Sequence, residues 1–596
     1  MKEHLAHMVR DRAARWGSRE VFRFRDKNEN GFKSYTWNEF SRDADKVSRA
    51  LISLGFGHGS HIGIFSDNRL EWTISDIAIL GIRGVVVPFF GTASRSQVKY
   101  IVDETEMPIM FVGNQEQLDK AIWLLEHSES LKRIVIFPNT TETDDERCIS
   151  WDNFMKLGED PIFGVELEQL YDQAQPFDLA TILYTSGTTG EPKGVMLGHE
   201  NFMECLVIHD NRLDLTDKDV SLCFLPLSHI FERTWTFYLM HCGVVNVFLE
   251  NPREVINVLP IANPTVMCTV PRFFEKTYEG IQVETAKWPK LKKNIFDWAI
   301  ETGHRCNEYK SKSESLPAVL KFKRNIAEKL VLKKLRNVFG KNMRQMPCAG
   351  AAIREDLLRF FHATGLFVNF GYGATETTAT VSCFKTDRYE FDSCGTVMPG
   401  IAVKFTEEGE IMVKGPTIFR GYYKKPEETA RTLKDGWYMT GDEGHFTHDG
   451  NLVMTDRIKD LFKTSVGKYV SPQKLELLLG QETLIEQVIV VGDNRKYISA
   501  LIVPSFEHLK SIAVKLGLDM TDRKKLVSHE ALIKLFQVKL DQIQAEVTPY
   551  ERVVKFTLLS EPFSVENKAM TSTLKLRRKV IAEQYKEQIE LMYSAG

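Results

Sequence analysis

A segment rich in glycine and hydroxyl side chains has the composition of a phosphate-binding loop. It reads Tyr184-Thr-Ser-Gly-Thr-Thr-Gly-Glu-Pro-Lys-Gly194 and follows an apolar run at 180–183 that predicts a buried strand. Glycines let the backbone turn tightly and present amide groups, and the hydroxyls add donors. A Walker loop ends in Gly-Lys-Ser/Thr at a helix start, but here Lys193 precedes Gly194 and Val195. The segment therefore predicts a different polyphosphate loop, with candidate contacts Thr185, Ser186, Gly187, Thr188, Thr189, Gly190 and Lys193.

Five more segments follow in order along the chain. They are Leu225-Pro-Leu-Ser-His-Ile-Phe-Glu-Arg233, Gly350-Ala-Ala352, Gly371-Tyr-Gly-Ala-Thr-Glu-Thr377, Tyr438-Met-Thr-Gly-Asp442 and Asp456-Arg-Ile-Lys-Asp460. With the loop, they resemble the motifs of the adenylate-forming superfamily: acyl-CoA synthetases, firefly luciferase and nonribosomal peptide synthetase adenylation domains. This resemblance implies ATP and coenzyme A as substrates and Mg²⁺ as cofactor. An acid would attack the α-phosphorus of ATP, and a thiol would then attack the acyl-adenylate.

The resemblance assigns roles to residues near the phosphates. Glu376 is expected to contact Mg²⁺ together with the Thr185 hydroxyl, and few protein bonds suffice because Mg²⁺ keeps several waters. Thr375 offers a hydroxyl to the α-phosphate. His229 holds the characteristic position of the substrate-side motif, so we count it with Glu376, Thr185 and Lys575 among the catalytic candidates.

Other motif residues are expected around the nucleoside. Tyr372 offers an aromatic face to adenine, and Asp442 can accept both ribose hydroxyls in charge-assisted hydrogen bonds. Arg457 is expected to bind ribose or phosphate; without the motif it would be interpreted as a surface ion pair. The remaining adenine-side candidates are Gly350, Ala351, Ala352 and Gly373.

The adenylation lysine is expected at Lys575, where it would stabilise charge on the acid and the α-phosphate. Many superfamily members have glycine before this lysine, whereas this chain has Leu574, so Lys568 and Lys579 remain alternatives.

The resemblance implies that the C-terminal domain rotates between the two half-reactions. Lys459 occupies the hinge position. Lys463 and Gly467 would face the site during thioester formation, with Gly467 admitting the pantetheine arm of coenzyme A.

Three segments look most like long-chain fatty acid–CoA ligases: 226–233, 463–472 and 573–577. Other acids (medium-chain, aromatic or bile acids) and a carrier-protein acceptor remain alternatives. A non-catalytic acyl-nucleotide sensor would be expected to lack Lys575 or Glu376. Phe231 and Trp235 could gate an acyl tunnel or belong to an aromatic core.

The length of 596 residues exceeds what one hydrophobic core holds, so at least two domains are expected. Short apolar runs alternate with helical patterns and predict an α/β fold with helix-flanked mixed or parallel sheets. These runs lie at 84–88, 133–137, 180–184, 244–248, 265–270 and 366–370. We expect a large domain over 1–456 that includes a β-barrel-like subdomain. Residues 457–596 predict a small α+β cap with a hairpin (488–491 and 498–503), a strand (553–559) and a basic helix from about Lys575.

The composition, 43% hydrophobic and 26% charged, is that of a globular protein. The net charge of −3 gives no argument for nucleic acid as a partner. The nine cysteines form no Cys-x-x-Cys pair, the N-terminus has no signal-peptide pattern, and the apolar stretch 74–90 is interrupted by charges. We therefore expect a cytoplasmic protein with reduced thiols and read 74–90 as a buried helix and strand.

One segment departs from this balance. Residues 287–344 contain 16 Lys or Arg and 5 Asp or Glu, a net charge of +11. Two interpretations fit: a solvated face of surface helices, or a peripheral contact with an anionic membrane at its inner face, because apolar residues interleave with the cations. The oligomeric state stays open.

Overall fold

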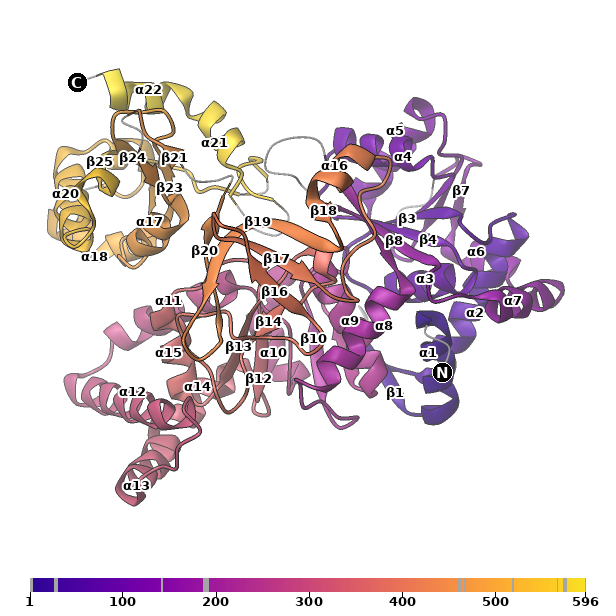
Figure 1. Cartoon of the computed structure of the whole chain (residues 1–596), viewed down its shortest axis with the longest axis horizontal. Helices are drawn as coiled ribbons and strands as arrows, with labels where there is room; N and C mark the ends of the chain where they lie inside the picture. The colour runs from indigo at the N-terminus through magenta and orange to yellow at the C-terminus, as the bar shows by residue number, and fades with distance from the viewer. Residues whose placement is uncertain are drawn as a thin grey trace.

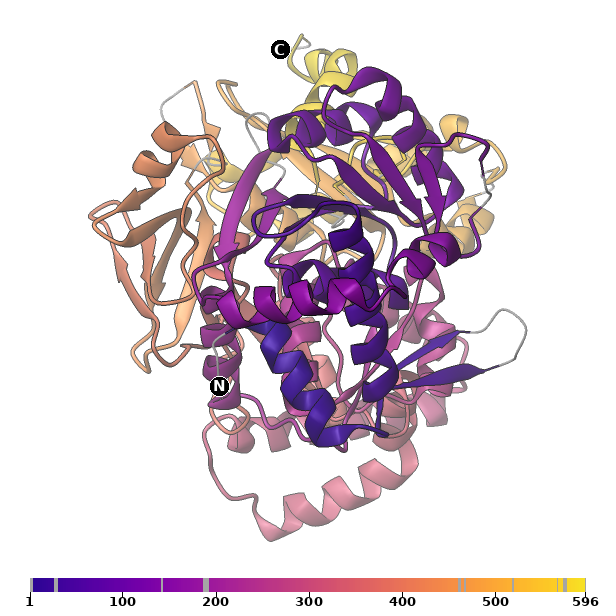
Figure 2. The ribbon, with the colours of Figure 1, turned by 90° about the vertical axis from the view of Figure 1, so that its right-hand side faces the viewer.

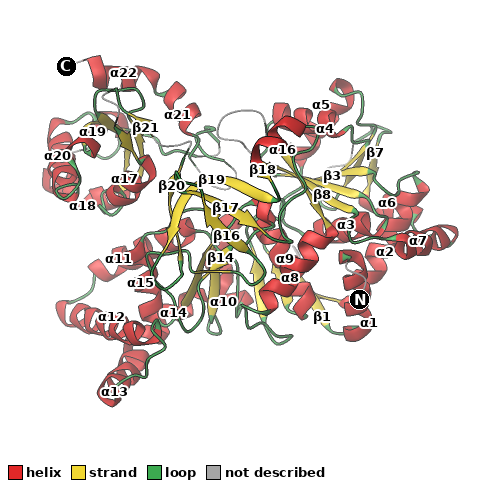
Figure 3. Cartoon of the chain, in the orientation of Figure 1, coloured by secondary structure: helices red, strands yellow, loops and turns green. Residues whose placement is uncertain are grey.

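The computed structural model describes residues 4–25, 31–140, 143–185, 192–458, 462–465, 468–516, 519–564, 566–571 and 576–594. Within these ranges, Lys463, Tyr469, Ser511, Lys515 and Leu516 are described by their backbone only. Figure 1 shows a large body and a smaller C-terminal lobe, coloured orange to yellow, above α11 (Pro271–Ala286) and α15 (Glu355–Thr364). In Figure 3, helices surround the sheets of both parts. This mixed α/β architecture confirms the predicted fold class.

The described residues form a seven-stranded sheet in the order β7-β6-β5-β3-β4-β8-β9, parallel except for the last pair. Apolar residues cover both of its faces. Ile62, Ile64 and Val86 pack in the core under α1, α2, α3, α6 and α7, whereas Val85 and Val87 pack in the core under α4 and α5. Alternate strand residues thus enter opposite layers, as a sheet buried on both sides requires. The strands are β3 His61–Phe65, β4 Val85–Phe89, β5 Ile109–Val112, β6 Arg133–Ile136, β7 Cys148–Ser150, β8 Leu179–Thr185 and β9 Lys193–Gly198, and the helices are α1 Leu5–Trp16, α2 Trp37–Ser53, α3 Leu70–Gly81, α4 Arg95–Thr105, α5 Gln115–His127, α6 Trp151–Leu157 and α7 Ile162–Gln173. The stretch 74–90 is therefore a buried helix and strand, as expected.

A second layer joins two four-stranded sheets, ordered β10-β11-β1-β2 and β12-β13-β14-β15. The strand expected at 265–270 is wrong in form: Val266 and Thr269 make isolated parallel bridges that link β10 to β12. The amides of Thr265 and Thr269 do donate to the Val220 and Pro347 carbonyls, and the threonine hydroxyls share these partners, so the run bonds to its neighbours without forming a continuous ladder. The Val220 amide donates to Thr265 Oγ1 (3.0 Å), and Thr269 Oγ1 donates to the Pro347 carbonyl (2.8 Å). The strands are β1 Glu20–Arg25, β2 Phe32–Thr36, β10 Val220–Cys223, β11 Val245–Phe248, β12 Gln345–Cys348, β13 Phe367–Tyr372, β14 Ser382–Cys383 and β15 Thr396–Val397.

An antiparallel five-stranded sheet lies between this layer and the C-terminal lobe (Figure 1). It forms a half-barrel with a small apolar core of its own. The β-barrel-like subdomain is thus present as an open half-barrel. Its strands are β16 Ala402–Phe405, β17 Glu410–Lys414, β18 Leu433–Lys434, β19 Trp437–Phe446 and β20 Leu452–Arg457, and α16 (Pro426–Thr432) precedes β18.

The C-terminal lobe has a separate hydrophobic core, built from residues beyond 462. The predicted hairpin is confirmed as antiparallel β23 and β24, and β25 pairs in parallel with β24. The predicted basic helix begins at Arg578. Lys575, where it was expected to begin, lies outside the described residues. The elements are β21 Phe462–Lys463, β22 Tyr469–Val470, α17 Pro472–Leu479, β23 Ile485–Val491, β24 Ile498–Pro504, α18 Phe506–Leu516, α19 Arg523–Val527, α20 Glu530–Ile543, β25 Val553–Leu558, α21 Arg578–Gln584 and α22 Lys586–Ser594. The exact boundary at residue 456 stays a prediction.

The basic segment 287–344 forms helices that project from the body at the lower left of Figure 1 and the lower edge of Figure 2. They are α12 (Lys290–Lys310), α13 (Ala318–Ala327), a π-helical turn (Glu328–Leu332) and α14 (Lys333–Arg336). Among the helices that the structure describes, none has the length and apolar character needed to cross a bilayer. All nine cysteines are free thiols.

Candidate functional site

One cavity of about 3620 Å³ brings together most of the motif residues. It lies where the seven-stranded sheet, the second layer, the half-barrel and the C-terminal lobe meet. Polar residues from strand ends occupy one part, as expected where strands end at a crevice. The motif residues on its wall are Thr185, Lys193, His229, Gly350, Ala351, Ala352, Tyr372, Gly373, Thr375, Glu376, Asp442 and Arg457.

The candidate phosphate loop connects β8 to β9. Thr185 ends β8 and pairs with Lys193 at the start of β9, so the hairpin presents both ends of the loop to the cavity. Lys193 forms an ion pair with Glu428 from α16 and lies 5.2 Å from the Tyr422 ring centroid. Ser186, Gly187, Thr188, Thr189 and Gly190 lie outside the described residues.

Glu376 lies in a short 3₁₀ turn after β13, and its carboxylate accepts a 2.9 Å hydrogen bond from the Tyr422 hydroxyl. Burial raises the pKa of this carboxyl, while the Tyr422 hydroxyl and the Arg457 guanidinium lower it. No cluster of three or more metal-ligating side chains occurs among the residues described. A single carboxylate on the wall of the cavity that Thr185 also lines fits Mg²⁺, which takes one or two carboxylates and completes its shell with water and phosphate oxygens.

Asp442 is the centre of a polar group on the half-barrel. The Tyr372 hydroxyl donates to it at 2.5 Å, and Arg457 Nε lies 3.3 Å from its other oxygen. Asp442 and Arg457 face each other across β19 and β20, so the sheet register holds this pair. Burial and Asp442 raise the pKa of Tyr372, which keeps its hydroxyl protonated as a donor. Arg457 thus forms an ion pair with Asp442 and lines the cavity, and its binding of ribose or phosphate stays a prediction.

Two glycines on the adenine side are required by the backbone. Gly350 has a φ of 94°, in the left-handed region. At Gly373, a Cβ atom would lie 1.5 Å from the carbonyl oxygen of Ala379. A side chain would strain the backbone at Gly350 and clash with it at Gly373.

His229 caps the N-terminus of α9 (Ile230–Cys242), because its Nδ1 accepts from the Phe231 amide at 3.2 Å. An accepting Nδ1 leaves the ring proton of a neutral imidazole on Nε2. A buried ion pair fixes the helix one turn further on: Arg233 contacts Asp76 of α3 at 2.9 Å and Thr181 of β8 at 2.8 Å. The helix bearing His229 is therefore tied to the strand that leads into the phosphate loop.

The other end of the cavity is mainly apolar. Trp235 lines it and is 4% exposed, with its Nε1 donating to Ser221 at 3.1 Å, and Phe231 also lines it. Trp235 is thus core and cavity wall at once. Further apolar lining comes from α11, α12, the link between them, the π-helical turn and α14, namely Phe273, Ile281, Trp288, Ile295, Leu330, Val331 and Leu335. The cavity thus has both the polar motif residues and a group of large apolar side chains on its wall.

Four functional candidates of the C-terminal lobe cannot be placed by side chain. Lys459, Gly467 and Lys575 lie outside the described residues, and Lys463 is described by its backbone in β21. Thr571 and Leu576, which flank the segment that contains Lys575, line the cavity.

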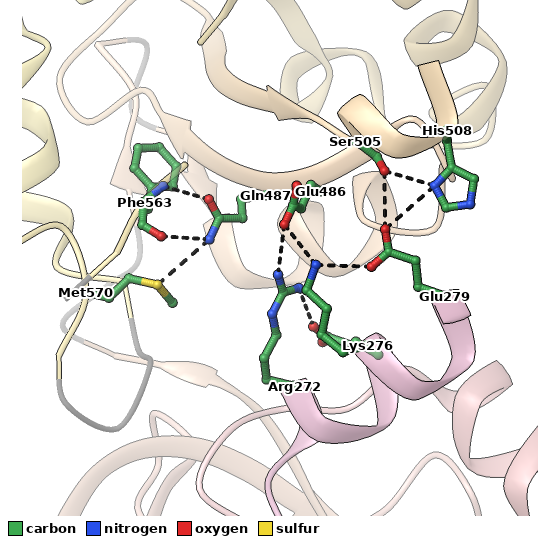
Figure 4. A network of polar contacts seen from close by, with 10 residues as sticks. Arg272, Lys276, Glu279, Glu486, Gln487, Ser505, His508, Phe563 and Met570 are labelled. Atoms are coloured by element: carbon green, nitrogen blue, oxygen red, sulfur yellow. Dashed lines mark hydrogen bonds and ion pairs between the residues drawn. The ribbon is translucent and has the colours of Figure 1, made fainter. Parts of the chain in front are cut away.

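The C-terminal lobe contacts α11 through polar groups (Figure 4). Glu486 of β23 lies 2.9 Å from Lys276 and 3.5 Å from Arg272. Glu279 accepts from Ser505 at 3.3 Å and lies 3.7 Å from His508. The lobe and α11 are therefore joined at this point by partly exposed charged and polar side chains.

Two residues in the site were not expected from the sequence. Tyr422 supports Glu376, and Glu428 pairs with Lys193 and, at 3.0 Å, with Arg431. They belong to a segment between the recognised motifs. The only sequence signal in this segment is the Pro-Glu-Glu start of α16, and acidic residues of this kind are typical of any helix N-terminus.

Comparisons with known proteins agree with this geometry. Residues 9–423 match the AMP-binding enzyme family, and residues 459–596 match the AMP-binding enzyme C-terminal domain. The chain is 30% identical to a long-chain-fatty-acid–CoA ligase of Mycobacterium bovis over 94% of this chain and 92% of that protein. It is 31% identical to long-chain-fatty-acid–CoA ligase 1 of Homo sapiens, over 94% of this chain and 83% of that protein.

Similar solved structures include the adenylation domain of a carboxylate reductase from Mycobacterium chelonae. Its TM-score is 0.76 at 22% identity, covering 99% of this chain and 91% of that one. A Mycobacterium tuberculosis fatty acyl CoA synthetase gives a TM-score of 0.62 at 17% identity, covering 98% of this chain and 99% of that one. At these identities the likeness concerns the fold.

Proposed function

Because the chain belongs to the AMP-binding enzyme family, we propose that it is an ATP-dependent long-chain fatty acid–CoA ligase. The observation that carries this proposal is the single cavity, which joins a polar nucleotide end to a long apolar end. Similarity to long-chain ligases over more than 90% of the chain supports the acid class.

In the first half-reaction, a carboxylate oxygen of the acid attacks the α-phosphorus of ATP, and the bond to pyrophosphate breaks. The protein contributes position and charge, as in other phosphoryl chemistry. Tyr372 holds the adenine, Asp442 and Arg457 the ribose, and Thr185 and Lys193 the phosphates. Mg²⁺, held by Glu376 and Thr185, would neutralise phosphate charge when bound.

Two residues act at the reacting carboxylate. His229 can donate a hydrogen bond from Nε2 at the boundary between the apolar chamber and the phosphates. Lys575 stabilises the charge shared by the carboxylate and the α-phosphate. Support for Lys575 comes from its motif and from the cavity-lining positions of Thr571 and Leu576.

In the second half-reaction, the thiol of coenzyme A attacks the acyl carbon, and AMP leaves. We propose that the C-terminal domain, residues 457–596, turns about Lys459 between the two steps. Lys463 and Gly467 would then face the site. The separate core of this lobe and its polar seat on α11 support such a rotation.

Replacement of the lysine tests this division of labour. We expect Lys575→Ala to abolish adenylate formation, measured by ATP–pyrophosphate exchange, and to leave thioester formation from supplied acyl-adenylate largely intact. Lys568→Ala and Lys579→Ala are the matched controls. Equal loss of both half-reactions in Lys575→Ala would refute the assignment.

A series of acids assayed for AMP release, with and without coenzyme A, tests the substrate. Highest turnover with long-chain acids, dependent on coenzyme A, is the expected result. A preference for medium-chain, aromatic or bile acids would be consistent with the proposed ligase class but would contradict the proposed long-chain substrate. Adenylate formation without thioester formation would point to a carrier-protein acceptor.

A further inference from the structure

The helices of the basic segment expose an unusual number of large apolar side chains. We define the α12–α14 surface by its exposed apolar residues Leu291, Ile295, Trp298, Val319, Phe322, Ile326 and Leu330. Phe322 is 67% exposed and Val319 is 69% exposed. A group of this kind on one projecting element marks an interaction site, because scattered single exposures are the ordinary case.

Helix α13 is apolar on two sides. Leu320 and Ala327 are buried on one side. At about 100° per residue, Val319, Phe322 and Ile326 fall within about 60° of one another on a different side. This second stripe is exposed although nothing in the internal packing of the helix requires it to be apolar.

Positive charge flanks this stripe. Lys323 and Lys329 are exposed and lie on either side of it by helical spacing. Glu328, the acidic residue nearest to them, pairs with Arg324 and Arg336. The whole segment carries a net charge of +11. Apolar side chains between lysines complement a surface with anionic headgroups above an acyl layer.

Two residues of the α12–α14 surface also line the cavity. Ile295 and Leu330 belong to the exposed surface, at 38% and 50% exposure, and also line the cavity. Lys292 and Lys334 stand beside them on its wall and are exposed. An acid entering here would pass from the α12–α14 surface directly into the apolar chamber.

We infer that the α12–α14 surface docks on an anionic lipid bilayer and places the mouth of the acyl chamber against it. Phe322 and its neighbours enter the acyl–headgroup boundary, and Lys323 and Lys329 contact lipid phosphates. This association is peripheral and reversible. The delivery of substrate rests on the proposed function, whereas docking itself does not.

Sedimentation of the full chain with vesicles tests docking. We expect binding to phosphatidylcholine vesicles containing phosphatidylglycerol and weak binding to phosphatidylcholine alone. Raising the salt to 1 M should release the protein, since the Debye length falls from about 10 Å at 0.1 M to about 3 Å. Equal binding to both vesicles, or none to either, would overturn the inference.

Matched variants locate the surface. Lys323→Gln with Lys329→Gln should lower the partition coefficient about tenfold or more, whereas Lys132→Gln with Lys524→Gln, exposed lysines elsewhere, should leave it unchanged. Phe322→Gln should lower it about tenfold, whereas Ile162→Gln on α7, of similar exposure at 68%, should not. Melting temperatures check that each variant is folded. Unchanged binding in both α13 variants would assign the surface to another partner, such as a protein.

Activity separates the two proposals. With palmitate supplied in anionic vesicles, the α13 variants should lose turnover in proportion to lost binding, and with a short water-soluble acid they should equal the parent. Vesicle binding without any fatty acid activation would contradict the proposed function alone. Fatty acid activation with unaltered vesicle binding in the variants would contradict the docking surface alone.

Discussion

At the scale of single residues, the nucleotide end of the cavity is held by contacts between groups from different elements. The hydrogen bond from Tyr422 to Glu376 joins the half-barrel side of the cavity to the turn after β13. It opposes the effect of burial on the Glu376 carboxyl, whose pKa is raised by desolvation. An ionised Glu376 is the form that can hold Mg²⁺.

Tyr422→Phe should therefore narrow the pH range of adenylation. Loss of the hydroxyl raises the pKa of Glu376 further, and a hydrogen bond to a charged group is worth about 1.5–3 kcal/mol. We expect the acidic limb of ATP–pyrophosphate exchange to move up by about one pH unit, with little change at alkaline pH. Tyr423→Phe, one residue along, is the control, and a uniform loss at all pH values would contradict this role.

The sequence predicts that the motif residues share a site, but it does not predict the residues that contact and position them. Asp442, Glu376 and Tyr372 have fixed neighbours in the chain, so their types and order predict a shared site, and the cavity brings them together. Tyr422 and Glu428 act through distant contacts set by the packing of α16 and β9, which no local pattern records.

At the scale of elements, α9 links three parts of the large domain. His229 caps it, Arg233 ties it to α3 and β8, and Glu232 points into the core. Burial raises the pKa of Glu232 to about 8, and the Cys223 thiol and the Leu225 backbone lower it only in part.

Glu232 should make the protein less stable as the pH rises. Its folded pKa lies above the unfolded value of about 4.3, so its contribution to stability is complete below about pH 4 and is lost as the pH rises to about 8. Glu232→Gln keeps the shape without the proton. We expect its melting temperature to exceed that of the parent increasingly from pH 5 to 8, and parallel curves would show that Glu232 does not titrate.

Elements with strong period and length could be predicted, and those shaped by side-chain bonds could not. The hairpin of β23 and β24 follows from two β-branched runs around a turn. The run 265–270 has the same composition, yet it forms only isolated bridges, in which the hydroxyls of Thr265 and Thr269 bond to the same neighbours as their backbone amides. The half-barrel came from the resemblance, because its strands are short and their pairing is non-local.

At the scale of the whole molecule, the C-terminal lobe contacts α11 through ion pairs and a hydrogen bond. Glu486 contacts Lys276 and Arg272, and the side chains of all three residues are partly exposed to solvent. Glu279 contacts Ser505 and His508 (Figure 4). Partly exposed pairs are worth about 1 kcal/mol or less each. Contacts of this strength are compatible with the proposed rotation of the lobe between the half-reactions.

Glu486→Gln should shift the balance between the two half-reactions. The orientation described here brings Thr571 and Leu576 to the cavity, so weakening this seat disfavours adenylation. We expect ATP–pyrophosphate exchange to fall a few-fold, about what 1 kcal/mol provides, while thioester formation from supplied acyl-adenylate is kept or increased. Glu530→Gln, which removes a pair with Lys534 inside the same lobe, should alter neither rate. A parallel decrease in both half-reactions of Glu486→Gln would mean that the α11 contact stabilises the fold without selecting an orientation of the lobe.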